Sequence, residues 1–111
     1  MNDQERISIE KIMNDMKNNG IASALIRQDG IMIHSTFALE DASAGIMANA
    51  ASVGDAILKL LKDKQKEMEV AMGGLYLITL PVKTYFLCGV LKQREQKTEL
   101  KQYAEKLKQY L

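Results

Sequence analysis

The residues best suited to chemistry are few and stand far apart in the sequence. His34 is the only histidine and Cys88 the only cysteine among 111 residues. A single histidine does not build a two-histidine metal site, and no Ser-His-Asp set can be located by spacing. We expect His34 to lie at the surface or half-buried. Cys88, between Leu87 and Gly89 in an apolar run, is typical of a small core residue rather than a nucleophile.

Motifs for phosphate binding or acid–base catalysis are also missing. Gly73-Gly74 fits neither a P-loop nor a dinucleotide fingerprint. Glu40-Asp41 stand at the start of a predicted helix, where carboxylates complement the helix dipole. Nothing marks Arg6, Arg27 or Arg94 as an arginine finger. The sequence therefore predicts a protein that is not an enzyme and that needs no cofactor or metal ion.

Length and composition indicate one ordinary globular domain spanning residues 1–111. Hydrophobic residues make up 47% of the chain and charged residues 26%, a balance that is typical of folded domains. One cysteine excludes an internal disulfide and suits a reducing compartment. No apolar run approaches the roughly 18 residues of a membrane span, and the N-terminus lacks the apolar segment of a signal peptide. We expect a cytoplasmic protein.

The net charge of +1 is unevenly spread. Residues 1–58 carry four basic and eight acidic side chains, whereas residues 59–111 carry eleven basic and six acidic ones. This asymmetry fits solvated helix faces of opposite sign, or a two-faced surface that helps to orient a partner. Acidic residues interrupt the basic half, and only 5% of residues are aromatic, so nucleic-acid binding is not expected.

The first third of the chain predicts a helix followed by a β-hairpin. Residues 4–18 carry one apolar stripe, with Asn2 and Glu5 as a capping pattern and Gly20 as the stop. Residues 21–27 and 31–36 are predicted strands joined by Asp29-Gly30, a strong turn signal. The first strand is apolar on both faces and should be central, while the second should be less covered.

Residues 40–62 predict the longest helix, and this helix has two different stripes. One is aliphatic and runs from Ile46 to Leu60. The other consists of small side chains, including Ala44, Ala48, Ala51, Ser52 and Asp55. Small side chains let another backbone approach closely, whereas a solvated face would carry more Lys, Glu and Arg. This face packs either on the protein's own sheet or against another chain.

The remaining segments complete an antiparallel sheet. Met68, Val70 and Met72 alternate with Glu67, Glu69 and Ala71, which predicts a short, half-exposed edge strand. Strands are expected at 75–80 and 85–91, with a turn at Pro81-Val82-Lys83 between them, and a last helix at 95–110. The order α-β-β-α-β-β-β-α favours an α/β (α+β) sandwich, in which helices flank one five-stranded antiparallel sheet.

The ordered set of motifs resembles the roadblock/dynein light-chain domain family. The resemblance is carried by Gly20-Ile21, Ala24-Leu25-Ile26 and Asp29-Gly30-Ile31 in the hairpin, and by the small-residue helix over 40–62. The Gly73-Gly74 hairpin and the apolar strand 85–91 before an amphipathic helix continue it, so that it covers essentially the whole chain. This resemblance implies the roadblock/profilin-like fold and a non-catalytic regulator or scaffold for small Ras-like GTPases.

The same resemblance implies a homodimer in which central helices pack together and third strands pair edge to edge. The residues that would form the interface are Ala44, Ala48, Ala51, Ser52 and Asp55 on the helix and Met68, Val70 and Met72 on the strand. We therefore expect a dimeric platform that binds a small Ras-like GTPase and modulates its nucleotide cycle or localisation. The alternative is a profilin-like or PAS/GAF-like small-molecule sensor, which would need a sizeable pocket between sheet and helix.

Overall fold

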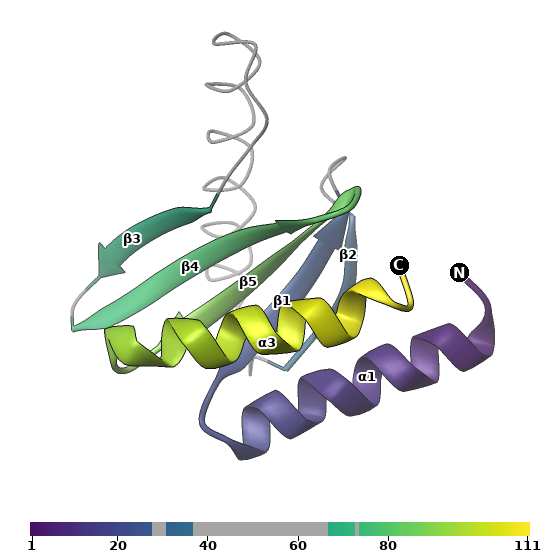
Figure 1. Ribbon diagram of the computed structural model, residues 1–111, viewed down its shortest axis with the longest axis horizontal. Helices are drawn as coiled ribbons and strands as arrows, with labels where there is room; N and C mark the ends of the chain where they lie inside the picture. The colour runs from purple at the N-terminus through teal and green to yellow at the C-terminus, as the bar shows by residue number, and fades with distance from the viewer. Residues whose placement is uncertain (28–30, 37–66, 73) are drawn as a thin grey trace, which may run out of the picture.

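The computed structural model describes residues 1–27, 31–36, 67–72 and 74–111, apart from the side chains of Val70 and Met72. Five antiparallel strands form one sheet in the order β2-β1-β5-β4-β3 (Figure 1). The strands are β1 (Ala22–Arg27), β2 (Met32–Ser35), β3 (Met68–Met72), β4 (Leu75–Val82) and β5 (Tyr85–Leu91). The helices are α1 (Asp3–Asn18) and α3 (Lys97–Lys108), the latter preceded by the 3-10 turn η1 (Arg94–Gln96). The expected five-stranded antiparallel sheet is confirmed.

The predicted ends of α1 are confirmed at the level of single hydrogen bonds. The Asn2 side-chain oxygen accepts a bond from the Glu5 amide at 2.8 Å, and the Asn2 amide donates to the Glu5 carboxylate at 3.2 Å. This capping box satisfies two amides that the first helical turn leaves without partners. At the other end, Gly20 has a φ of +85°, a conformation that glycine adopts without a Cβ clash.

The hairpin of β1 and β2 follows the expected burial. β1 lies between β2 and β5, and four of its six residues are buried, whereas every β2 residue is half-buried. The Arg27 amide donates to the Ile31 carbonyl at 2.8 Å, and the ladder is irregular between Leu25 and Ile26. The predicted Asp29-Gly30 turn lies outside the described residues.

The connection between β4 and β5 differs from the sequence prediction. β4 continues through Pro81 and Val82, which lie opposite Phe86 and Tyr85, so the turn consists of Lys83 and Thr84. Lys83 adopts a φ of 55° in this turn. The ladder between β3 and β4 ends at Thr79, so among the described residues β4 is an edge strand where Pro81 occurs. At such a position proline removes no ladder donor.

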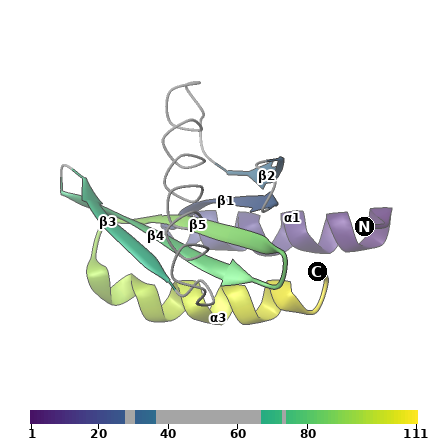
Figure 2. The ribbon, with the colours of Figure 1, turned by 90° about the horizontal axis from the view of Figure 1, so that it is seen from above.

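Two apolar clusters occupy opposite faces of the sheet. α1 and α3 lie side by side on one face (Figure 2), and their buried residues Ile9, Met13, Met16, Leu100, Ala104 and Leu107 join the larger cluster. The other face carries a smaller buried cluster of Ala24, Ile26, Leu77, Phe86 and Cys88. None of the described helices has the length and apolarity needed to span a membrane.

Gly89 lets α3 approach the sheet closely. A Cβ added at this position on β5 would lie 2.8 Å from Cδ1 and 3.0 Å from Cδ2 of Leu100. Leu100 is fully buried in the larger apolar cluster. The absence of a side chain at Gly89 therefore sets the depth at which α3 sits on β5.

Candidate partner-binding edge

β3 forms one edge of the described sheet, because its only strand partner there is β4. Met68 lies opposite Thr79, Val70 opposite Leu77 and Met72 opposite Leu75. Edge strands present unpaired backbone N–H and C=O groups that can pair with another chain. The three strand residues expected at a dimer interface thus occupy an edge, and their contact with a second chain stays a prediction.

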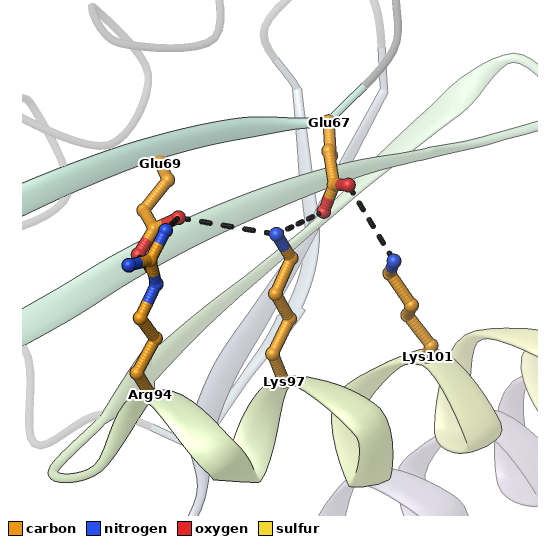
Figure 3. Close-up of polar contacts among 5 residues, drawn as sticks. All are labelled: Glu67, Glu69, Arg94, Lys97 and Lys101. Atoms are coloured by element: carbon orange, nitrogen blue, oxygen red, sulfur yellow. Dashed lines mark hydrogen bonds and ion pairs between the residues drawn. The ribbon is translucent and has the colours of Figure 1, made fainter.

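Two carboxylates face η1 and α3: Glu67, which directly precedes β3, and Glu69 on β3. Glu67 and Glu69 point toward Arg94, Lys97 and Lys101 (Figure 3). We call these five residues the edge ion-pair cluster. It consists of three cations and two carboxylates, and it joins an edge strand to a helix that lies far from it in the sequence.

Lys97 is the centre of the edge ion-pair cluster. Its Nζ lies 2.8 Å from Oε2 of Glu67 and 3.9 Å from Oε2 of Glu69. Arg94 contacts Glu69 through both Nε and Nη2, at 3.0 and 3.3 Å. Lys101 approaches Oε1 of Glu67 at 3.4 Å. Each carboxylate therefore has two cationic partners. The bidentate contact of Arg94 orients the Glu69 carboxylate.

These cations change the titration of Glu67. The hydrogen bond from Lys97 and the charges of Lys101 and Lys97 hold the pKa of the Glu67 carboxyl below its usual range, while partial burial opposes this shift. A carboxyl with a lowered pKa in the folded state stabilises the fold at pH values above its unfolded-state pKa. That contribution is lost as the pH falls through the lower, folded-state pKa.

Removing Lys97 is therefore expected to raise the pKa of Glu67 toward its usual range. We expect the carboxyl resonance of Glu67 in Lys97→Gln to titrate at higher pH than in the unmodified chain, as followed by NMR. Lys108→Gln, which removes an exposed charge from the same helix, serves as the control. An unchanged Glu67 titration in Lys97→Gln would contradict this assignment.

The other expected interface residues cannot be placed in the same way. Ala44, Ala48, Ala51, Ser52 and Asp55, and the whole predicted helix over 40–62, lie outside the described residues. Glu40-Asp41 do as well. Arg94, Lys97 and Lys101 were not predicted from the sequence as partners of β3. Their spacing of three and four residues places them on one side of a helix, but only the sheet order shows which strand they meet.

Cys88 and His34 have the burial that the sequence predicted for each of them. Cys88 is fully buried on β5, where burial raises the pKa of its thiol, and Thr79 Oγ1 donates to its Sγ at 3.6 Å. His34 is half-buried on β2, and its Nε2 has no hydrogen-bond partner among the residues that the structure describes. No group of His, Cys, Asp and Glu in the described ranges could hold a metal ion.

A depression of about 320 Å³ lies between the end of β4 and α3. It is lined by Glu67, Leu80, Pro81, Lys101, Ala104 and Glu105. Its position next to Glu67 and Lys101 makes it continuous with the edge ion-pair cluster. The charged side chains at its rim suit a polar contact better than an enclosed apolar ligand.

Comparison with known proteins links this architecture to one group of folds. No protein-family model matches the chain, and no curated protein matches it in sequence. In structure it is similar to Myxococcus xanthus MglB, with a TM-score of 0.74 and 16% identity over 98% of this chain and 91% of that chain. It is also similar to a Roadblock/LC7 domain from Streptomyces avermitilis, with a TM-score of 0.66 and 16% identity over 88% and 89% of the two chains.

A weaker similarity extends to profilin. Acanthamoeba castellanii profilin II matches with a TM-score of 0.53 and 19% identity over 86% of this chain and 87% of that chain. The profilin-like description of the fold class is thereby confirmed, although the bacterial proteins match better. The chain therefore has the fold of the roadblock/LC7 domains, as its sequence motifs implied.

Proposed function

We propose that this chain is a non-catalytic, dimeric regulatory or scaffold module of the cytoplasm. Its partner is a small Ras-like GTPase, whose nucleotide cycle or localisation it modulates. The observation that carries the proposal is the roadblock/LC7 fold with β3 at the sheet edge. Two sequence features support it: the small-residue stripe over 40–62 and the alternating apolar residues of β3.

The mechanism that we propose is positional. A two-fold dimer presents the same surface twice and forms a platform wider than one 111-residue chain. Binding to one conformation of the mobile switch segments of a GTPase would shift their population toward that conformation. Arg94, whose guanidinium is engaged by Glu69, is not required to enter a nucleotide site in this mechanism.

Binding to purified GTPases tests this function. We expect the chain to bind at least one small Ras-like GTPase encoded in the same genome, and to distinguish its GDP-bound form from its form bound to a GTP analogue. Calorimetry with each nucleotide form gives the two affinities, and release of a fluorescent GDP analogue reports the effect on exchange. Failure to bind any of these GTPases in either form would overturn the proposal.

A small-molecule sensor remains the second candidate, because the depression between β4 and α3 offers a place for a ligand. Its volume of about 320 Å³ lies at the lower end of the range for ligand sites. A sensor would be stabilised against heat by one member of a metabolite panel, and Lys101→Gln would weaken that effect. A GTPase-binding platform would show no such response.

A further inference from the structure

Self-pairing of β3 would bring carboxylates of two chains together. A two-fold axis perpendicular to the sheet keeps each side chain on its own face, and side chains alternate between faces along a strand. Odd-numbered residues of β3 would then oppose odd-numbered residues of the second copy. With the axis at Met68, Glu67 opposes Glu69, and with the axis at Glu69 this residue opposes itself. With the axis at Val70, the two Glu69 residues are diagonal neighbours.

Such an arrangement is unfavourable for bare carboxylates. Like charges that lie directly opposite each other on adjacent strands destabilise the pair, and diagonal neighbours at about 7–8 Å still interact. Glu67 and Glu69 alone would contribute a charge of −2 from each copy to the same stretch of the joined sheet. An edge of this kind would repel its own copy, which is a known way of preventing edge-to-edge pairing.

In this chain the repulsion is cancelled from within the same subunit. Arg94, Lys97 and Lys101 contact the two carboxylates at 2.8 to 3.9 Å. The side chain of Lys97, which bridges both carboxylates, is only 25% exposed, whereas Arg94 is 67% exposed and Lys101 54%. The three cations change the charge of this stretch from −2 to +1, and each carboxylate is paired within its own chain before any partner arrives.

We propose that the edge ion-pair cluster is the determinant that allows β3 to pair with the β3 edge of a second copy of this chain. The inference rests on the self-association in the proposed function and assigns its electrostatic control to Lys97 and Lys101. Without these lysines Glu67 loses both of its partners in the cluster, Glu69 keeps only Arg94, and the unpaired carboxylate repels the carboxylates of the second copy. With them, pairing depends on the apolar positions and on the backbone.

The test compares the dimer dissociation constants of matched variants by sedimentation equilibrium. We expect Lys97→Gln combined with Lys101→Gln to raise the dissociation constant by roughly tenfold, because the repulsion acts on both sides of the two-fold axis. Raising the salt concentration should tighten the dimer of this variant, since salt screens the repulsion. Lys92→Gln combined with Lys108→Gln removes the same charge from exposed positions outside the cluster and should leave the constant unchanged.

A rescue separates this role from simple anchoring of β3 to α3. Adding Glu67→Gln and Glu69→Gln to the double lysine variant removes the repelling groups and should restore the dissociation constant to within a few-fold of the native value. If the cluster only held β3 in place, the carboxylate substitutions would give no recovery. The single variant Lys97→Gln should show a smaller change in the same direction if the double variant does not fold.

The outcomes distinguish this inference from the function on which it rests. A native monomer would overturn both. A native dimer whose double lysine variant behaves like the Lys92 and Lys108 control would overturn the inference and leave the proposed function standing. A weakened variant that salt weakens further, or that the carboxylate substitutions fail to rescue, would also overturn the inference.

Discussion

Replacing Leu100 with alanine is expected to lower the free energy of unfolding by about 2–5 kcal/mol. Leu100 is fully buried in the cluster that joins α1 and α3 to the sheet. Its loss leaves a cavity above β5 that the surrounding helices fill only in part. Urea denaturation followed by circular dichroism measures the effect, at one fixed protein concentration because the proposed dimerisation would contribute to the apparent stability.

The close approach of Leu100 to Gly89 makes this prediction sharper. Gly89→Ala alone should cost about 1–3 kcal/mol, because the new methyl group collides with the leucine Cδ atoms. In the Leu100→Ala background the same methyl group has room, so the double variant should lose clearly less than the sum of the two single losses. Strict additivity would show that the contact does not set the position of α3.

Gly74→Ala is the matched control for this cycle. Gly74 has a φ of +83°, and an added Cβ would meet no atom within 4 Å. The loss of unfolding free energy in Gly74→Ala therefore comes from backbone strain and not from packing. We expect this cost to be the same with and without Leu100, because the two sites share no contact.

Ala48→Glu is expected to convert the proposed dimer to a monomer, with a rise of at least about 100-fold in the dissociation constant. The prediction rests on the sequence, in which Ala48 belongs to the small-residue stripe over 40–62. A carboxylate there would be buried without a partner in each of two facing helices. Light scattering after size exclusion measures the mass, with Thr98→Glu at an exposed position of α3 as the control.

The result of this substitution also decides between the two interpretations of the stripe. If the small face packs on the protein's own sheet, Ala48→Glu lowers the free energy of unfolding of each chain. If it packs against a second copy, the folded chain persists as a monomer. An unchanged dimer with unchanged stability would contradict both interpretations, packing on the protein's own sheet and packing against a second copy.

Features set by local sequence were predicted well from the residues alone. The capping box of Asn2 and Glu5 spans three residues, so its parts are visible without any knowledge of the fold. The boundaries of β5 and the central position of β1 followed from apolar runs, because strands covered on both faces show no polar alternation. The predicted end of β4 at residue 80 was wrong, because Pro81 was interpreted as a turn signal. Proline is tolerated there because the ladder with β3 stops at Thr79, which the sequence alone does not show.

Features set by long-range packing were out of reach of the sequence. Arg94 and Glu69 are separated by 25 positions, and only the order of the strands brings them together. The need for glycine at position 89 depends in the same way on Leu100 of a different element. The candidate interface was predictable as an alternating strand at an edge, but its neutralising lysines were not, since any exposed helix carries such residues.

The solution mass of the unmodified chain tests the central claim most directly. Light scattering over a range of micromolar concentrations should give about 24.8 kDa, twice the 12.4 kDa of one chain. This result would support self-association of the chain and the platform built on it. A mass of 12.4 kDa at every concentration would contradict the account.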